Sequence, residues 1–439
     1  MVHGHGLNST IQAQARATHT DSYYAASASP APVYPALDQP VETDVCVVGG
    51  GITGCSTALH LAEKGYRVVL LEQHRVGWGA SGRSGGQIIT GYACEMGKLE
   101  RLVGASDARR HWDMSLEAMR LVRSRIDQHG IECDLQWGHL HAAIKPRQVR
   151  ELEEWAEQLE QQYNYDQLEL LYGEDVRPVI NTDRYIAGMM DHGSGHLHPL
   201  NYTLGLARAA AAHGVQFYES TPATEVREGA RPLVSTPQGS VTCDHLVFCG
   251  NAYLGALQPD LRRKVMPVGT YIIATESLGA HRAREIMPAN AAIADINFVL
   301  DYFRCSADHR LLYGGRVSYS TLTPGNLKTT MRPRMLKVFP ELEDVKIEYA
   351  WGGFVAITMN RAPDLGRLRD NIYFAQGFSG HGMALTGFAG ALMAEAIAGT
   401  AERLDLFARI PHNPFPGGRL LRTPALVLGT LYYRLRDLL

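Results

Sequence analysis

The sequence has few cysteines, and none of them are spaced as in a metal or redox motif. Seven cysteines are scattered between Cys46 and Cys305, and no CxxC pair occurs. An odd number of cysteines without paired spacing argues against a disulfide framework and against a zinc site. We therefore expect a chain that folds in a reducing cytoplasm.

Long apolar runs are also missing. No stretch of roughly 18 uncharged apolar residues occurs, and the first 20 residues contain no apolar segment of a secretory signal. We therefore expect neither a membrane-spanning helix nor a signal peptide. Residues 420–439 come closest, but Arg422, Arg434 and Arg436 interrupt them. This C-terminal tail suits packing against protein better than peripheral contact with a bilayer, and both stay open.

Charge of one sign is not concentrated anywhere in the sequence. There are 42 basic and 45 acidic residues, which give a formal net charge of −3. A nearly neutral chain without a basic cluster gives no reason to expect a nucleic-acid partner.

The length and the apolar content predict a large folded protein. The chain has 439 residues, of which 45% are apolar, and this size favours two domains. Residues 1–40 are rich in Ala, Ser, Pro, Gly and His and are typical of an extended arm. Within the arm, Tyr23 and Tyr24 either anchor it on the protein surface or belong to a flexible tail.

From Asp44 onward the pattern predicts a strand, a helix and a second strand. Residues 45–48 and 68–71 are short apolar runs, as expected for buried parallel strands. Between them, an amphipathic helix is expected from Gly54 to about Lys64, with Gly65 as its C-cap. This is a complete βαβ unit.

The first motif that carries chemistry is a GxGxxG turn inside this unit. Gly49 permits the tight turn, Gly51 lets the backbone approach a pyrophosphate, and Gly54 lets the helix pack on the sheet. The helix N-terminus offers unpaired N–H donors to the phosphates. Glu72 ends the second strand, where it can accept hydrogen bonds from the adenosine ribose. The unit predicts a dinucleotide site.

A second loop of small residues distinguishes FAD from NAD. It directly follows the ribose-binding strand, where a flavin needs close backbone approach and a nicotinamide does not. Arg83 can pair with a phosphate or lie near the flavin ring. The cofactor-binding residues expected in this loop are Gly79, Ala80, Ser81, Arg83, Gly86 and Gln87.

A third glycine-rich segment lies near the far end of the chain. Residues 376–383 lead into an Ala-rich helix, and glycines at a helix start can expose N–H groups to an anion. For a flavin, the useful target is the N1 and C2=O region, where negative charge develops on reduction. His381, between Gly380 and Gly382, is therefore expected mainly to contribute its backbone.

These segments resemble the D-amino-acid-oxidase-like family of flavoproteins, and more closely its gamma-glutamylputrescine oxidase branch. The resemblance rests on residues 22–25, the GxGxxG unit, and residues 79–83, 378–382 and 415–418. It implies an α/β fold with a Rossmann-type FAD-binding domain and a substrate domain of mixed antiparallel sheet and helices. It also adds further cofactor-binding positions, namely Ile52, Thr53, Gln73, Val226, Gly250, Gly377, Ser379 and Met383.

The domain boundaries follow from the motifs and from the periodicity between them. Residues 106–130 and 146–163 have helical periodicity, and the alternation around 268–275 and 311–318 predicts an antiparallel sheet. We expect FAD-binding segments at 41–95, 196–255 and 345–400, substrate-domain segments at 96–195 and 256–344, and a tail at 401–439.

Departures from the family pattern bear on how FAD is attached, on how the substrate is bound and on the reaction with oxygen. Residues 351–363 contain no cysteine and residues 77–87 no histidine, so the resemblance implies non-covalent FAD. Sarcosine-oxidase-like members carry a lysine for the substrate carboxylate where this chain has Ala384. Such members also place a lysine on a strand similar to residues 311–316, and its absence argues against fast reaction with oxygen.

The resemblance implies removal of a hydride from a carbon that bears nitrogen. We expect a gamma-glutamylated polyamine as substrate, in polyamine catabolism, with oxygen or a quinone as acceptor. The pocket candidates are Tyr271, Tyr302 and Trp351 as aromatic lining, with Arg316 for a distant carboxylate and His381 near the flavin. Two His-x-His pairs, at 139–141 and 196–198, lack a third ligand, so no metal is expected.

Two alternatives stay open from the sequence. The first is a D-amino-acid or cyclic imino-acid dehydrogenase that passes electrons to a quinone. The second is a flavin-binding regulatory or assembly protein without turnover, because no residue in the sequence by itself requires catalysis.

Overall fold

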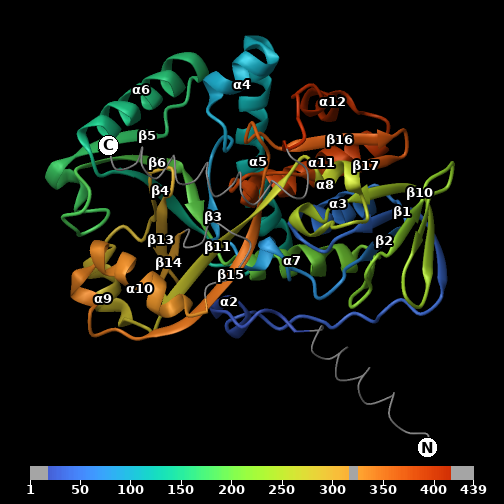
Figure 1. Ribbon diagram of the computed structural model, residues 1–439, viewed down its shortest axis with the longest axis horizontal. Helices are drawn as coiled ribbons and strands as arrows, with labels where there is room; N and C mark the ends of the chain where they lie inside the picture. The colour runs from blue at the N-terminus through green and yellow to red at the C-terminus, as the bar shows by residue number, and fades with distance from the viewer. Residues whose placement is uncertain (1–17, 316–324, 417–439) are drawn as a thin grey trace, which may run out of the picture.

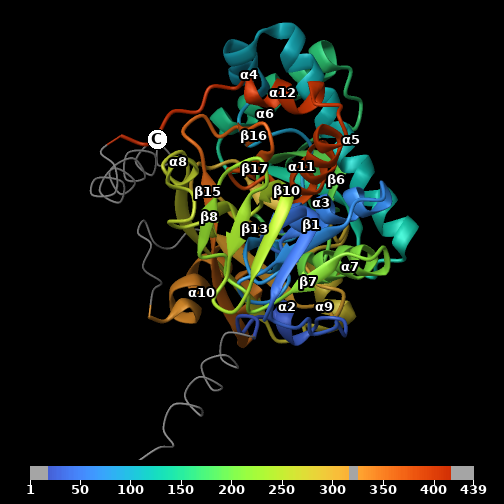
Figure 2. The ribbon, with the colours of Figure 1, turned by 90° about the vertical axis from the view of Figure 1, so that its right-hand side faces the viewer.

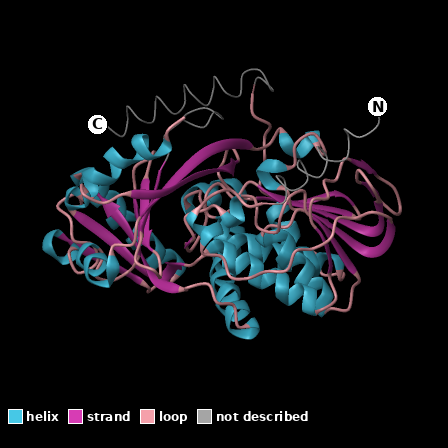
Figure 3. Ribbon diagram, turned by 90° about the horizontal axis from the view of Figure 1, so that it is seen from below, coloured by secondary structure: helices cyan, strands magenta, loops and turns pink. Residues whose placement is uncertain are grey.

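The computed structural model describes residues 18–315 and 325–416 (Figure 1). Arg316 and the tail residues 417–439 therefore lie outside the described residues, as does the start of the arm. Strands lie at both ends of the molecule, and helices fill the space between them (Figure 3).

One sheet contains the predicted βαβ unit. Strand β1 (Pro40–Val48) pairs in parallel with β2 (Val68–Leu71) and with β10 (Ser240–Phe248). All four residues of β2 are buried, as expected for a strand covered on both faces. The remaining strands of this eight-stranded sheet are β7 (Gln216–Tyr218), β8 (Glu225–Arg227), β9 (Leu233–Ser235), β16 (Asp364–Arg369) and β17 (Ile372–Gln376).

Apolar helices pack beside this sheet (Figure 2). Helix α3 (Ile52–Glu63) lies between α7 (Pro199–Ala212) and α11 (Gly382–Ile397) and contacts both. These helices are mostly buried, which explains why their sequences are rich in Ala and Leu rather than amphipathic. The long helix α5 (Ala105–His129) then covers α11.

The second sheet has nine strands and is mostly antiparallel. The antiparallel sheet expected from the alternation around 268–275 and 311–318 is confirmed for the described residues, because β11 (Met266–Thr275) pairs antiparallel with β14 (Leu311–Gly315). Residues 316–318 lie outside the described residues. The other strands are β3 (Gln87–Ile88), β4 (Gln136–Ala143), β5 (Leu168–Tyr172), β6 (Ala187–His196), β12 (Ala292–Asp295), β13 (Asp301–Cys305) and β15 (Ile347–Ile357).

Helices also flank the second sheet. Helix α6 (Pro146–Tyr163) has the bounds that its periodicity predicted and packs on β4 and β6. Helix α10 (Leu327–Val338) packs on β11 and β15. The shorter helices of the described residues are α2 (Tyr23–Ala26), α4 (Met96–Val103), α8 (Pro259–Arg262), α9 (Gly279–Ile286) and α12 (Glu402–Ala408).

Strand β15 differs from the expected segmentation. Residues 345–400 were expected to belong entirely with the FAD-binding segments, yet β15 pairs along its length with β11 in the nine-stranded sheet. Its sequence alternates only weakly, so sheet membership depends on a partner strand about 80 residues away.

The described part of the N-terminal arm is held by two tyrosines. Tyr23 and Tyr24 are buried in the main apolar cluster. The Tyr23 hydroxyl donates to Asp308 at 2.6 Å, and Arg304 donates to the Tyr24 hydroxyl at 3.1 Å. Of the two interpretations left open by the sequence, anchoring is therefore confirmed.

All seven cysteines are free and buried. Burial raises the pKa of Cys133, Cys249 and Cys305 to about 12. These thiols pack as small apolar groups.

No single helix within residues 18–315 and 325–416 is both long enough and apolar enough to cross a membrane. Taken together, helices α11 and α12 have the length and apolar composition of a membrane span, but the chain bends by 120° between them.

Candidate cofactor site

Glycine-rich turns from three distant parts of the chain surround one cavity of about 460 Å³. The cavity lies at the carboxyl ends of β1, β2 and β10, where ligands bind in open parallel sheets. Most cofactor positions expected from the sequence line it, namely Gly49, Gly51, Ile52, Thr53, Glu72, Gln73, Gly79, Ala80, Ser81, Gly250, Ser379, Gly380, Gly382 and Met383.

The first turn is shaped by close backbone contacts. Gly49 has a φ of +112°, a conformation that L side chains rarely adopt. A Cβ on Gly54 would lie 1.9 Å from the Gly49 carbonyl oxygen. Only glycine therefore allows α3 to start directly beneath the turn, with its N-terminus at the cavity wall.

Glu72 connects the second strand to the first turn. Its carboxylate accepts hydrogen bonds from the backbone N–H groups of Gly50 at 2.7 Å and His74 at 2.8 Å. Burial raises the pKa of Glu72 to about 7, although these two donors act in the opposite direction. The side chain is thus fixed at the cavity wall and can change charge near neutral pH.

The second loop is tied to the first by a short contact. The Ile52 backbone N–H donates to the Ser81 hydroxyl at 3.0 Å. Beside it, the Arg83 guanidinium lies 3.9 Å from the centre of the Trp78 ring, and its Nε donates to the Trp78 carbonyl at 2.6 Å. Arg83 is not among the residues that line the cavity, but Trp78, on which its guanidinium packs, does line it.

The third segment brings the start of α11 to the same cavity. Ser379, which has a φ of +54°, donates its backbone N–H to the Ala356 carbonyl at 3.0 Å. Gly380, Gly382 and Met383 then line the cavity at the helix N-terminus. His381, which lies between these two glycines, is not part of the lining, and burial lowers its pKa to about 4.

Several expected cofactor residues support the site from behind the cavity wall. Gly86 packs under the Leu197 carbonyl, and the Gln87 amide donates to the Ile293 carbonyl. Val226 packs in the apolar cluster of the eight-stranded sheet. The set that does not line the cavity is Gly54, Arg83, Gly86, Gln87, Val226, Gly377 and His381.

The pocket candidates do not all share one side of the second sheet. Tyr271 packs in the apolar cluster with α9 and α10, whereas its neighbour Ile272 belongs to the main cluster together with Trp351. Since successive strand residues face opposite sides, Tyr271 points away from the cofactor cavity. Trp351 is buried and donates its indole N–H to the Arg83 carbonyl at 2.9 Å. Tyr271 is therefore a correction to the expected lining.

Sequence reasoning missed cavity residues that only tertiary pairing brings together. Val355 and Ala356 come from β15 and reach the cavity through its pairing with β11. Tyr253 follows β10 and its hydroxyl accepts from the Phe354 N–H at 3.3 Å. A signal for Tyr253 existed, because it directly follows the expected Gly250 turn.

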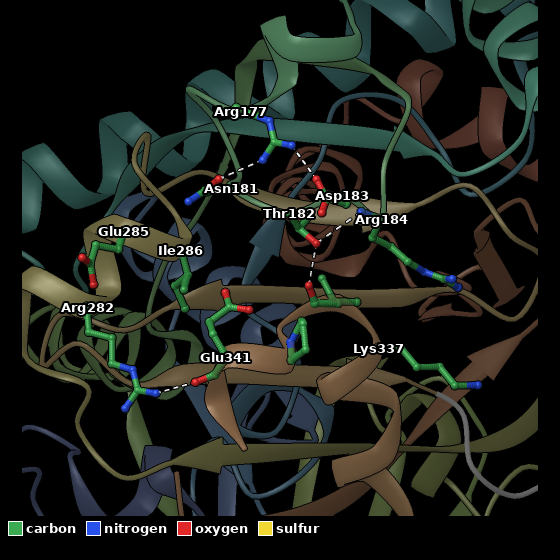
Figure 4. Close-up of a pocket in the computed structure, with 12 residues that line it drawn as sticks. Arg177, Asn181, Thr182, Asp183, Arg184, Arg282, Glu285, Ile286, Lys337 and Glu341 are labelled. Carbon is green, nitrogen blue, oxygen red and sulfur yellow. Dashed lines mark hydrogen bonds and ion pairs between the residues drawn. The ribbon is translucent and has the colours of Figure 1, made fainter. Parts of the chain in front are cut away.

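A second hollow, of about 780 Å³, lies between the segment 177–184, which precedes β6, helix α9 and the last residues of α10 (Figure 4). Two of the arginines that line it form ion pairs: Arg177 contacts Asp183, and Arg282 contacts Asp344 at 2.6 Å. It contains none of the glycine-rich turns, so it does not offer a dinucleotide site.

Metal-binding clusters of three His, Cys, Asp or Glu residues are not found in the part of the chain that the structure describes. His139 and His141 nevertheless lie together on β4, with ring centres 4.4 Å apart.

The comparison of the whole chain with known proteins agrees with this geometry. The family model described as "FAD dependent oxidoreductase" matches residues 44–396. The chain is 45% identical to gamma-glutamylputrescine oxidoreductase of Escherichia coli strain K12 over 95% of this chain and 98% of that protein. It is 40% identical to a probable oxidoreductase OrdL of Haemophilus influenzae, over 95% and 97% of the two chains.

Solved structures show the same fold at lower identity. L-proline dehydrogenase from P. horikoshii matches with a TM-score of 0.70 and 20% identity, over 84% of this chain and 96% of that chain. Gly51 and Ser81 line the cavity side by side, and a Cβ on Gly51 would lie 2.8 Å from the Ser81 hydroxyl. Only a residue without a side chain is accommodated there, and this close approach of backbone fits the dinucleotide part of FAD. The chain therefore belongs to the FAD-dependent oxidoreductase family that includes D-amino-acid oxidase, and it is an FAD-dependent enzyme.

Proposed function

We propose that this enzyme oxidises a carbon–nitrogen bond of a gamma-glutamylated polyamine such as gamma-glutamylputrescine. A hydride leaves the carbon that bears the amino nitrogen, and the resulting imine hydrolyses to an aldehyde and ammonia. FAD, when bound, accepts that hydride. The observation that carries the proposal is the near full-length similarity to the Escherichia coli gamma-glutamylputrescine oxidoreductase.

Different residues around the cavity are placed to hold different parts of FAD. The N-terminus of α3 is placed to receive the pyrophosphate, and Glu72 is placed to accept from the ribose hydroxyls. The N-terminus of α11 supplies N–H groups for the flavin end, where they stabilise negative charge on reduction. We propose that FAD is held non-covalently, because the cavity thiol, Cys249, is buried with a raised pKa.

We further propose that the two sheets define the two domains. The eight-stranded sheet with α3, α7 and α11 would form the FAD-binding domain, and the nine-stranded sheet the substrate domain. On this assignment the last FAD-binding segment starts after β15, near residue 358, rather than at 345.

The electron acceptor is part of the proposal. Strand β14 reads Leu311–Gly315 and carries no lysine in the described residues, so it offers no cation to assist oxygen at that position. We propose that a quinone reoxidises the enzyme faster than oxygen does. Stopped-flow mixing of the reduced enzyme with each acceptor measures both rates.

The substrate is tested by anaerobic reduction of the bound flavin. Purified holoenzyme is mixed with gamma-glutamylputrescine, putrescine, D-amino acids, L-proline and pipecolate, and loss of the visible flavin absorbance is followed. Rapid bleaching by gamma-glutamylputrescine alone is expected. Bleaching by proline or pipecolate without bleaching by any gamma-glutamyl amine would replace the proposal with a cyclic imino-acid dehydrogenase.

A further inference from the structure

Arg304, on strand β13, carries a guanidinium that is buried behind the second glycine-rich loop (residues 79–87, here called the cofactor loop). The residue is only 3% exposed. Its Nε donates to the Gly85 carbonyl at 2.8 Å, and a Cβ added to Gly86 would lie 3.0 Å from its Nη2. Ser84, the residue before Gly85, lines the cofactor cavity. The guanidinium therefore contacts the cofactor loop one residue away from the cavity wall.

The part of the loop that Arg304 contacts lies against the start of α11. The Ser84 hydroxyl donates to the Met383 sulfur at 3.2 Å, and both residues line the cavity. Met383 belongs to the first turn of α11, whose N–H groups are proposed to serve the flavin end of the cofactor. On that placement, Arg304 lies behind the flavin end of the cavity.

The N-terminal arm supports the same part of the loop. Trp351 donates its indole N–H to the Arg83 carbonyl at 2.9 Å, and the Tyr24 ring packs edge-on against Trp351 with ring centres 5.3 Å apart. Arg304 in turn donates from Nη2 to the Tyr24 hydroxyl at 3.1 Å. Tyr24 therefore contacts both of the side chains that hold carbonyl groups of the cofactor loop.

All five N–H donors of the Arg304 guanidinium are directed at uncharged acceptors. Two acceptors are the Gly85 carbonyl and the Tyr24 hydroxyl, and the other three are the Leu197 carbonyl at 2.9 Å, the Cys305 carbonyl at 3.3 Å and the His196 Nδ1 at 3.4 Å. The His196 Nε2 donates to the Asn290 carbonyl, and burial, with Arg304, lowers the pKa of His196 to about 3. The imidazole is therefore neutral, and its Nδ1 can accept.

The positive charge of Arg304 has no bonded anion among the described residues. Asp134 lies within electrostatic range, because Arg304 opposes the burial that raises the pKa of this carboxyl, but Asp134 is exposed and does not accept a hydrogen bond from Arg304. Burying a charge is costly unless an opposite charge accompanies it. A cation held here by neutral groups alone can still stabilise an anion that forms nearby.

We propose that Arg304 is a positioning residue for the flavin: it fixes the cofactor loop behind the flavin end, and its charge favours the reduced cofactor. The inference rests on the proposed placement of the flavin end at α11 and not on the identity of the substrate. Reduction adds two electrons and one proton to the neutral flavin ring, which leaves one negative charge near N1 and C2=O. A buried cation nearby lowers the free energy of that anion and raises the reduction potential.

The test measures the midpoint potential of the bound flavin, which needs no substrate. Arg304→Gln removes the charge and keeps a polar group, whereas Arg304→Lys keeps the charge and loses the planar fork of donors. Arg282→Gln is the control, because Arg282 forms a surface ion pair with Asp344 beside α9. Each holoenzyme is reduced anaerobically together with a reference dye, and the FAD affinity of each apoprotein is titrated by fluorescence.

In Arg304→Gln, the equilibrium constant for flavin reduction is expected to fall at least tenfold, a shift of about 30 mV for two electrons. FAD affinity is expected to fall at least tenfold as well. In Arg304→Lys, the equilibrium constant is expected to stay within twofold of the control, while FAD affinity stays weakened because three donors replace five.

Equal potentials in Arg304→Gln and the control would overturn the proposal even if FAD affinity fell, since the arginine would then be structural only. A potential in Arg304→Lys that matches the Gln variant would assign the shift to movement of the loop, and this also contradicts the proposal. Should Arg304→Gln not retain FAD, Arg304→Lys decides alone: a tenfold fall in its equilibrium constant rejects the role of the charge, and a value within twofold of the control supports it.

The outcome is separate from the substrate. If wild-type enzyme is bleached by gamma-glutamylputrescine while the potentials of the Arg304 variants match the control, the role of Arg304 is wrong and the proposed function stands. If wild-type enzyme is bleached only by another amine while the potentials shift as expected, the substrate is wrong and the role of Arg304 stands.

Discussion

Glu72 makes cofactor binding sensitive to pH. Its folded-state pKa, about 7, lies above its ordinary value, so the protonated form stabilises the apoprotein at low pH and that contribution is lost as the pH rises through about 7. The ribose hydroxyls of FAD prefer the ionised carboxylate. FAD affinity is therefore expected to rise several-fold between about pH 6 and about pH 8, which fluorescence titration of the apoprotein measures.

Glu72→Gln provides the matched control for that titration. The amide has nearly the same shape but cannot ionise, so its FAD affinity is expected to be about tenfold weaker and flat with pH. A pH slope that persists in this variant would assign the titration to another group.

Gly54 is the second residue whose role is open to a sharp test. Gly54→Ala places a methyl group 1.9 Å from the Gly49 carbonyl oxygen, so α3 must move away from the turn. We expect purified protein without bound flavin and a loss of about 1–3 kcal/mol in unfolding free energy. Gly229→Ala, where no atom lies within 4 Å, should retain flavin and stability. Equal flavin content in the two variants would contradict the close-packing argument.

Residues with a local signature were predictable, and those placed by tertiary pairing were not. Gly49 and Glu72 are marked by their spacing within one βαβ unit, and both line the cavity. Val355 reaches the cavity only because β15 pairs with β11, which no local pattern encodes. Tyr271 was misplaced because the face of a strand depends on register, and a shift of one residue reverses it.

At the scale of elements, the packing of α11 on α3 sets the position of the α11 N-terminus, which lines the cofactor cavity. A Cβ on Gly390 would meet the Thr57 nitrogen at 2.6 Å, whereas one on Gly387 would find its nearest neighbour at 3.7 Å. Gly390→Ala should therefore lower the unfolding free energy by about 1–3 kcal/mol, and Gly387→Ala should raise it by up to about 1 kcal/mol through helix propensity. Denaturant melts of both holoenzymes compare the two. Equal destabilisation by the two substitutions would show that α11 does not rest on α3 through Gly390.

The bounds of a helix or strand were predictable where the pattern of its own residues is enough to define it. Helix α6 has the bounds its periodicity gave, since one face of charged residues and one apolar face define it completely. Strand β15 was expected within an FAD-binding segment, yet it pairs with β11 in the nine-stranded sheet, because its weak alternation suits either sheet.

At the scale of the whole molecule, the cofactor cavity joins the two sheets. Its walls include Gly49 and Gly250 beside the first sheet, and Val355 and Ala356 from the second. FAD binding should therefore stabilise both sheets together, by about 2.7 kcal/mol at a free FAD concentration 100 times Kd. Calorimetry of the holoenzyme is expected to show one unfolding transition at a higher temperature than the apoprotein. Two separate transitions, with only one moved by FAD, would show that the sheets unfold independently.

Because every cysteine is buried, thiol reactivity can be used to follow the unfolding of this protein. A native molecule offers no thiol to an alkylating or chromogenic reagent, and the count rises from none toward seven only as the fold opens. The rate at which each thiol reacts then reports when its own surroundings open. Cys249 reports on the wall of the cofactor cavity, and Cys305 reports on the nine-stranded sheet. A single cysteine introduced on the surface would then carry a dye with no background from the native seven.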